Sequence, residues 1–118
     1  NKIVIGAAFY ARTWERVDNI NNGLYQAGKF KSFIPYRQFD KQISRDSGFV
    51  FYRDSVAKAP YSYNPSKRIF ATFDDKLSIS QKAQYVKDKG LRGIMFWELT
   101  LDDYENGLLD MIDEVKRQ

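Results

Sequence analysis

Acidic side chains are the main candidates for chemistry in this chain, because its 118 residues contain no histidine and no cysteine. Ser-His-Asp and Cys-His mechanisms are therefore excluded within these residues, and so are disulfides and thiolate metal ligands. The candidates are the pairs Asp74–Asp75 and Asp102–Asp103, the group Asp110, Asp113 and Glu114, and the single Glu98. Because cleavage of a glycosidic bond usually needs two carboxylates flanking that bond, the placement of these groups decides which of them could act.

Most of these carboxylates stand where local structure would use them. The two adjacent pairs fall at a turn or a helix cap, and the group of three shares the charged face of a predicted helix. Only Glu98 ends a buried-looking strand, Gly93–Leu99. Because side chains alternate along a strand, Met95, Trp97 and Leu99 face one way and Glu98 faces the other. We therefore interpret Glu98 as a structural partner that points toward the helical layer, and not as an acid catalyst.

Trp97 is the leading candidate for binding, and two interpretations of it stay open. A tryptophan in an apolar run commonly belongs to the core. At the carboxyl end of a parallel strand, its indole could instead stack on the apolar face of a pyranose ring. Tyr10 and Arg12 present the same choice, because polar side chains appear abruptly where an apolar strand ends. They form either a structural ion pair or part of a site.

Outside residues 14–76, the chain is predicted to form a strand, a helix, a second strand and a second helix, which would position these residues. They are predicted at Lys2–Tyr10, Ser78 to about Gly90, Ile94–Leu99 and about Tyr104–Lys116. Ser78 and Gln81 have the spacing of a capping box, which makes Ser78 the expected N-cap. Two parallel strands joined by a right-handed helical crossover form a βαβ unit. Sites in such folds lie at the carboxyl ends of the strands, where Tyr10 and Trp97 fall.

The middle segment, residues 14–76, is rich in aromatic residues. It holds twelve of the seventeen Phe and Tyr residues, which we interpret mainly as the core of a small sheet and less readily as a sugar-stacking wall. A short amphipathic helix is predicted at Tyr36–Arg45. Three aromatic runs separated by turn residues, Phe49–Asp54, Ala59–Tyr63 and Arg68–Phe73, predict an antiparallel meander. The segment would be an insertion in the loop after the first strand.

The composition excludes other classes of protein. With 43% hydrophobic and 16% aromatic residues the chain can bury a core, so we expect one folded domain or a piece of a larger one. Its net charge of +4 comes from Lys and Arg spread along the chain, without the charged block of a nucleic-acid arm. The apolar run Ile3–Ala11 is about half as long as a membrane-spanning helix. Because the chain opens on a buried-looking strand, we expect it to start within a longer protein.

Four stretches of the chain resemble the C-terminal part of glycoside hydrolase family 18, the chitinases and chitinase-like proteins. Ile5–Trp14 is similar to the family's seventh barrel strand, usually G-x-P-F-Y-G-R-x-W, and Lys89–Leu99 to its eighth, G-L-G-G-x-M-x-W-E-L. Phe73–Asp75 with Ser78 resembles the Tyr-Asp-Asp…Ser stretch that returns from the family's insertion domain, and Ala59–Tyr63 fits that domain. The matches cover nearly the whole chain in the family's order.

The resemblance implies an α/β fold of a specific kind. Residues 1–13 and 77–118 would form the last two βα units, strands seven and eight with their helices, of a partial (β/α)8 TIM barrel. Residues 14–76 would form an α+β chitinase insertion domain with an antiparallel sheet.

The resemblance also implies a ligand and the residues that contact it. The ligand would be chitin or an N-acetylglucosamine oligosaccharide, and no cofactor or metal is implied. Trp97 would be the floor under the sugar in the −1 subsite, with Met95 lining the same subsite. Tyr10 and Arg12 would contact the substrate at the mouth of the barrel. An extracellular or cell-envelope location is suggested by the family alone.

The chain departs from the family pattern in three places, and two patterns are missing. Ala8 and Ala11 stand where Pro and Gly are usual, and no Gly follows Trp97-Glu98-Leu99, which leaves the exact sugar preference open. The catalytic signature D-x-x-D-x-D-x-E of the fourth strand is absent, and so is the Met-x-Tyr-Asp pattern of the sixth. The chain would therefore supply part of a binding cleft and no catalytic residue, and alone it should hydrolyse nothing.

Two further hypotheses remain open beside a hydrolase fragment. The parent could be a chitinase-like lectin that has lost its catalytic acid, since every motif quoted above would look the same. The chain could also be a freestanding α+β interaction module in which Trp97 is buried. We expect no nucleic-acid and no membrane partner. Because two barrel strands leave unpaired edges, we expect those edges to favour self-association.

Overall fold

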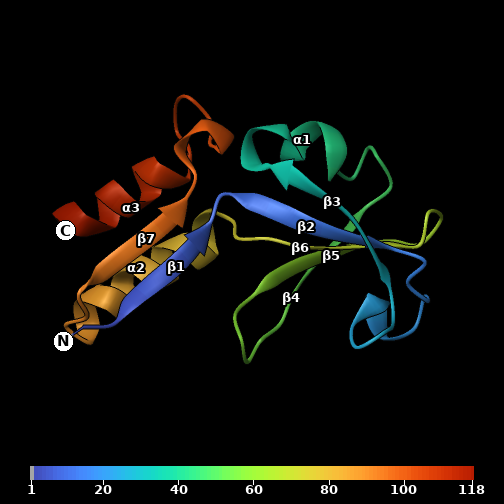
Figure 1. Cartoon of the computed structure of the whole chain (residues 1–118), viewed down its shortest axis with the longest axis horizontal. Coiled ribbons are helices and arrows are strands. Elements are labelled where there is room, and N and C mark those ends of the chain that lie inside the picture. Colours follow the sequence, from blue (N-terminus) through green and yellow to red (C-terminus); the bar gives the residue numbers. More distant parts are fainter. Residues whose placement is uncertain (1) are drawn as a thin grey trace.

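The computed structural model describes residues 2–118 and contains two sheets that follow each other along the long axis of the molecule (Figure 1). The strands are β1 (Val4–Ala8), β2 (Tyr10–Glu15), β3 (Lys29–Pro35), β4 (Val50–Arg53), β5 (Pro60–Asn64), β6 (Ile69–Thr72) and β7 (Gly93–Trp97). The helices are α1 (Phe39–Gln42), α2 (Lys76–Asp88) and α3 (Leu108–Arg117), with short 3-10 turns η1 (Asn21–Gly23), η2 (Tyr36–Gln38) and η3 (Leu99–Leu101). The protein is therefore mixed α/β, with one parallel pair and one antiparallel sheet.

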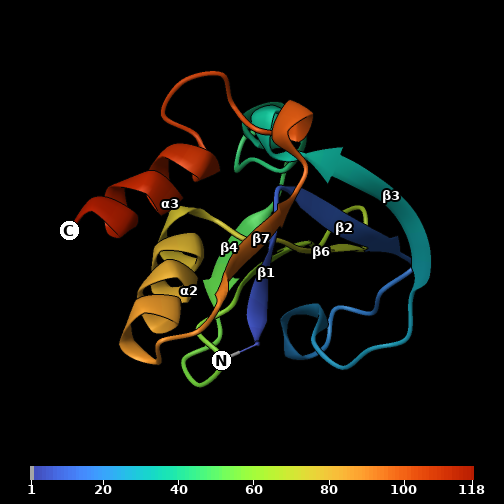
Figure 2. The same ribbon diagram turned by 60° about the vertical axis from the view of Figure 1, so that its left-hand side comes forward.

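β1 and β7 form the predicted βαβ unit, with α2 in the crossover. Their parallel register runs from Val4 opposite Gly93 to Ala8 opposite Trp97. Figure 2 shows α2 and α3 on the same side of this pair. Between strands and helices lies a core of apolar side chains, Ala7, Phe9, Ile79, Leu108 and Ile112. The parallel pairing predicted from the sequence is confirmed.

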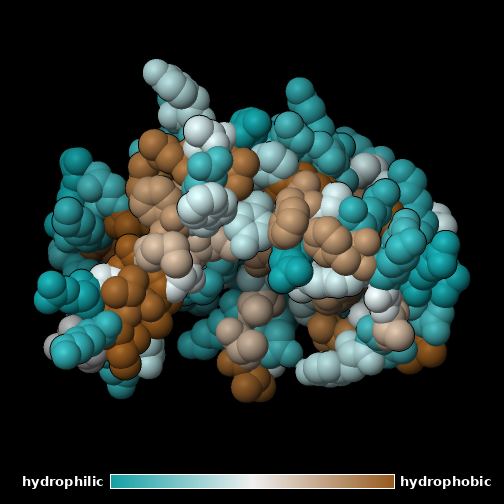
Figure 3. Space-filling view, in the orientation of Figure 1, coloured by the Kyte–Doolittle hydropathy of each residue, from teal (hydrophilic) through white to brown (hydrophobic). Residues whose placement is uncertain are grey.

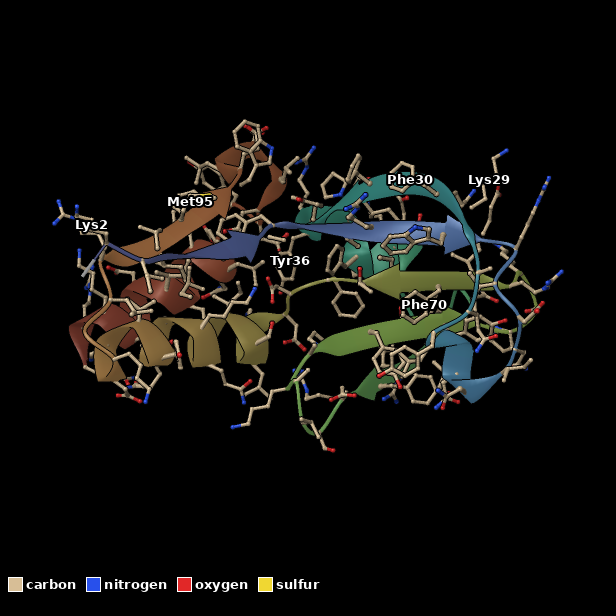
Figure 4. All side chains as sticks on the ribbon, turned by 60° about the horizontal axis from the view of Figure 1, so that its bottom comes forward. Lys2, Lys29, Phe30, Tyr36, Phe70 and Met95 are labelled. Atoms are coloured by element: carbon tan, nitrogen blue, oxygen red, sulfur yellow. The ribbon has the colours of Figure 1, made fainter. Side chains whose placement is uncertain are left out.

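β7 buries one face and exposes the other, as strand alternation predicts. Ile94 and Phe96 pack against the core, and Phe96 stacks on Phe9 with ring centroids 4.8 Å apart. Met95 and Trp97, on the other face, are 55% and 63% exposed. Figure 3 shows hydrophobic side chains gathered over β1 and β7, and Figure 4 shows Met95 on β7. This face of the parallel pair is apolar but uncovered within residues 2–118.

The start of α2 corrects the predicted cap. Asp75, not Ser78, is the N-cap, and the two residues form a reciprocal capping box. The Ser78 amide donates to Asp75 Oδ1 and the Asp75 amide donates to Ser78 Oγ, both at 2.9 Å. The predicted partner, Gln81, has a buried side-chain oxygen with no hydrogen-bond partner within residues 2–118. An aspartate at the N-cap also places negative charge at the positive end of the helix dipole, which favours this register.

The last helix begins later than predicted. α3 starts at Leu108, and Tyr104 lies fully exposed in the preceding loop. Asp102 fixes this start, because its carboxylate accepts hydrogen bonds from the amides of Leu108 and Leu109 at 2.8 and 2.9 Å. Gly107 allows the close approach, since a Cβ there would lie 2.3 Å from Asp102 Oδ1. The predicted capping role is therefore met in part, because Asp102 accepts from the first amides of α3 while Gly107 occupies the N-cap position.

The antiparallel sheet has the order β3-β2-β6-β5-β4 and contains the predicted meander as β4, β5 and β6. Its strand β2 begins at Tyr10, so the strand predicted at Lys2–Tyr10 ends at Ala8 and only Phe9 separates the two sheets. β3 was not predicted. The helix predicted at Tyr36–Arg45 is shorter than expected, with η2 followed by the four residues of α1. One face of this sheet packs against α1 through a second core, Ala11, Ile34, Ile43, Phe49 and Ala71.

Candidate functional site

A hollow of about 340 Å³ opens where the two sheets meet, and we call it the Trp97 hollow. It is lined by Tyr10, Phe33, Pro35, Trp97, Glu98 and Leu101. These residues come from the start of β2, the end of β3, the end of β7 and the turn η3. The hollow thus lies at the carboxyl end of a parallel strand, where α/β folds commonly hold their ligands.

Backbone pairing brings the two sides of the Trp97 hollow together. Ala8 pairs with Trp97 across the parallel sheet, and Tyr10 pairs with Pro35 across the antiparallel sheet. Phe9, between the two strands, donates its amide to the Trp97 carbonyl at 2.9 Å. Because so few residues separate Trp97, Tyr10 and Pro35 along these pairings, their side chains line one hollow.

Trp97 presents an accessible indole in this structure. At 63% exposure it is no core residue within residues 2–118, and the peptide bond that joins it to Glu98 is cis. Met95 shares its strand face two residues earlier and is also exposed, but it does not line the hollow. An exposed indole offers a flat apolar surface with an N–H donor at its edge. Such a surface can stack on a ring that carries polar groups at its rim.

Arg12 lies beside the hollow and not in it. Its guanidinium carbon lies 5.5 Å from the ring centroids of Trp14 and Phe30 and 5.6 Å from that of Phe33. These distances are within the range of cation–π contacts. In the part of the chain that the structure describes, the ion pairs between carboxylates and basic side chains do not include Arg12. Within residues 2–118, the rings therefore hold an arginine that forms no ion pair with a carboxylate.

Phe33 is a lining residue that sequence reasoning missed. It is 58% exposed and meets the Tyr10 ring edge-on, with ring centroids 5.4 Å apart. Its strand was missed because a register shift leaves Lys31 without a partner and breaks the alternation of β3. The sequence signal was therefore two phenylalanines three residues apart, Phe30 and Phe33, which follows neither a strand period nor a full helical stripe.

The carboxylates serve structure, as their positions suggested. Asp74 accepts hydrogen bonds from Ser78 Oγ at 2.8 Å, Lys82 Nζ at 2.7 Å and the Ala8 amide at 3.1 Å. Glu98 lies one residue beyond the end of β7, so strand alternation does not govern its direction. Its carboxylate accepts a hydrogen bond from the Thr100 hydroxyl, so its partner is a loop residue rather than the helical layer. A catalytic carboxylate pair is therefore not assembled at the hollow by residues 2–118.

The surroundings of Tyr36 raise the pKa of its phenol well above the ordinary value. Its pKa is raised to about 12, first because burial disfavours the phenolate and then because Asp103, Asp102 and Asp75 repel it. The group therefore stays a neutral hydroxyl at physiological pH. Figure 4 shows Tyr36 where the chain passes between the two sheets.

Residues 2–118 contain no group of three or more His, Cys, Asp or Glu side chains placed to hold a metal ion. None of their helices combines the length and the apolar character needed to cross a membrane.

Comparison with known proteins gives consistent matches. The model of glycosyl hydrolases family 18 matches residues 1–102. Chitinase A1 of Niallia circulans is 35% identical over 113 residues, covering 86% of this chain and 16% of that protein. The structure of chitinase ChiW from Paenibacillus sp. str. FPU-7 matches with TM-score 0.85 and 42% identity, covering 96% of this chain and 10% of that one. The family 18 N-acetylglucosaminidase of Paenibacillus barengoltzii matches with TM-score 0.83 and 40% identity, covering 96% and 33%. The chain thus spans a third or less of each of these proteins.

Proposed function

Because the chain belongs to glycosyl hydrolases family 18, we propose that it forms one side of the sugar-binding cleft of a chitin-hydrolysing enzyme. The substrate class is β-1,4-linked N-acetylglucosamine polymer. The observation that carries this proposal is the Trp97 hollow, where an indole that is 63% exposed lies at the end of a parallel strand and lines the hollow together with Tyr10. The names of the related chitinases support the substrate class.

The proposed architecture is the last two βα units of a TIM barrel with an inserted α+β domain. Residues 1–13 and 77–118 would belong to the barrel and residues 14–76 to the insertion, with β2 (Tyr10–Glu15) crossing this boundary and pairing in the antiparallel sheet. In support, β1 and β7 are parallel and expose an apolar face that includes Val4 and Met95. Further barrel strands would cover this face and pair with the outer edges of β1 and β7. Self-association through those edges stays a prediction.

The proposed role of each side chain follows from its position and from the apolar surface or hydrogen-bond donors that it exposes. Trp97 forms the floor under a sugar ring, with Met95 extending the same apolar strand face. Tyr10 approaches the ring from the opposite side of the hollow. Arg12, held by the neighbouring aromatic rings, directs its N–H donors toward sugar oxygens. No residue of this chain is proposed as the catalytic acid.

Hydrolysis would be substrate-assisted and retaining, with the acid supplied by residues outside this chain. A Glu would protonate the leaving oxygen, and the acetamido group of the sugar would attack the anomeric carbon in place of an enzyme nucleophile. A chain without that Glu should therefore bind sugar but not turn it over. Adding a segment with D-x-x-D-x-D-x-E should restore turnover of a chito-oligosaccharide. Absence of turnover with such a segment would count against the hydrolase, whereas the lectin alternative is decided by whether the parent carries Glu at the end of its fourth strand.

Sugar binding at Trp97 can be tested with the two tryptophans of the chain. In Trp14→Phe the only remaining indole is Trp97, and its fluorescence should change as a chito-oligosaccharide is added. In Trp97→Phe the remaining indole reports on Trp14. Loss of the stacking surface in Trp97→Ala should weaken binding about tenfold, equivalent to ~1.4 kcal/mol, while Trp14→Phe stays within about twofold. Unchanged affinity in Trp97→Ala, measured by calorimetry, would exclude the proposed site.

A further inference from the structure

A second hollow, of about 350 Å³, lies on the side of the antiparallel sheet that faces α1, and we call it the lysine hollow. Three lysines line it, Lys31 from β3, Lys41 from α1 and Lys67 from the turn between β5 and β6. Thr13 and Ser32 also line it, and no Asp or Glu does. It shares no lining residue with the Trp97 hollow.

The three lysines have no acidic partner among residues 2–118. The ion pairs of the described residues use other basic side chains, Arg53, Arg68, Lys82 and Arg117. Residues 14–76 hold eleven Lys and Arg against seven Asp and Glu, while the rest of the chain has eight of each. The net charge of +4 is therefore carried entirely by the segment that contains these lysines. Like charges around one concave surface raise each other's energy, and a bound anion would relieve this repulsion.

Hydroxyl groups add neutral hydrogen-bonding atoms to the lysine hollow. Thr13 Oγ1 and Ser32 Oγ lie 2.9 Å apart across the pairing of β2 and β3. Thr13 is 1% exposed, so β2 holds its hydroxyl in a fixed position. Because side chains alternate along β2, Thr13 faces the side opposite to Arg12 and Trp14. The lysine hollow is therefore separated by the thickness of the sheet from the rings of Trp14, Phe30 and Phe33 that surround Arg12.

We propose that the lysine hollow binds a tetrahedral dianion, that is, a phosphate or sulfate group. Lysine ammonium groups act as point charges with several rotatable donors, which suits an oxyanion approached from several sides. A carboxylate, by contrast, is matched best by the planar fork of arginine, and no arginine lines this hollow. Three ammonium groups also compensate a dianion more fully than a monoanion. This inference does not depend on the proposed sugar site.

The test is a titration of the protein with inorganic phosphate, sulfate and acetate at constant ionic strength, followed by NMR of the lysine side-chain CH2 groups. We expect saturable shifts at Lys31, Lys41 and Lys67 with phosphate or sulfate, and much weaker ones with acetate. Whichever of phosphate and sulfate binds more tightly identifies the group that the hollow prefers. Linear, unsaturated shifts for both, or equal binding of acetate, would overturn the proposal.

A matched pair of triple variants separates a site from net charge. The first carries Lys31→Gln, Lys41→Gln and Lys67→Gln. The control carries Lys29→Gln, Lys58→Gln and Lys76→Gln, three exposed lysines that line no part of the hollow and change the net charge equally. Phosphate affinity should fall at least about tenfold in the first and less than about twofold in the control. Equal losses of phosphate affinity in the two triple variants would overturn the proposal. The single variant Lys67→Gln, in a turn, repeats the test and should lose about threefold in phosphate affinity.

Discussion

Replacing Asp74 with alanine should remove a buried polar connection between the two sheets. Asp74 follows β6 of the antiparallel sheet, and its carboxylate reaches the amide of Ala8 at the end of β1 and Lys82 on α2. Its side chain is only 10% exposed. The Asp74→Ala variant therefore leaves the Ala8 amide, the Ser78 hydroxyl and the Lys82 ammonium without this acceptor.

The loss can be estimated contact by contact. An unsatisfied buried amide costs ~1–3 kcal/mol, which applies to Ala8. The ion pair with Lys82 contributes only ~0–1 kcal/mol, because the lysine side chain is 36% exposed and can regain water. Ser78 loses little, since its hydroxyl also lies 3.2 Å from the Asp75 carbonyl. We expect a loss of about 3 kcal/mol in the free energy of unfolding, a large share of the ~5–15 kcal/mol typical of a domain.

Thermal and urea unfolding followed by circular dichroism measures this loss. A change of about 3 kcal/mol should lower Tm by roughly 10 °C in a chain of this length. Asp74→Asn keeps one acceptor oxygen and should lose about half as much. The control is Asp113→Ala, which removes an exposed i,i+4 pair with Arg117 and should cost less than about 0.5 kcal/mol. If Asp74→Ala costs no more than this control, the assigned role of Asp74 is wrong.

Two other perturbations test the electrostatics near the Trp97 hollow. Asp102→Ala removes the acceptor for the first amides of α3 and should destabilise the protein by about 2 kcal/mol. Hydrogen exchange at the amides of Leu108 and Leu109 should become faster, and unchanged exchange would contradict the capping role of Asp102. The raised pKa of Tyr36 means that the unfolded chain loses this proton before the folded chain does. Stability should therefore fall as the pH rises from about 10 toward 12, and Tyr36→Phe should flatten this dependence in urea unfolding measured across that range. An equally steep fall in Tyr36→Phe would assign the effect to other groups.

Elements marked by local signals were predictable from the sequence. The meander of β4, β5 and β6 was found because turn residues such as those at Asn64-Pro65-Ser66 separate aromatic runs. β3 was missed because Lys31 has no cross-strand partner, so the run does not alternate. The cap of α2 was misplaced because Ser78-x-x-Gln81 also fits the capping pattern that Asp75 and Ser78 form three residues earlier. A local pattern cannot choose between two overlapping registers without the tertiary contacts of Asp74.

The candidate site was predictable in part. Strand alternation gave the shared face of Met95 and Trp97, and the end of an apolar run marked Tyr10. The Trp97 hollow also depends on Phe33, which reaches Tyr10 through antiparallel pairing between segments that are far apart along the chain. Nothing local specifies that pairing. The same limit hid the contact of Arg12 with three aromatic rings, which is assembled from two strands.

Phe9 is fully buried between β1 and β2, and it leaves the connection between the two sheets little conformational freedom. Its amide donates to Trp97 and its carbonyl accepts from the Tyr36 amide at 3.0 Å, so one residue is clamped from both sides. The chain returns through Asp74, which is clamped as well. We therefore expect the two sheets to move together as one rigid body, without hinge motion between them. The distance between Trp97 and Tyr10 would then be preset before any ligand arrives, and recognition at this hollow would select ligands by width.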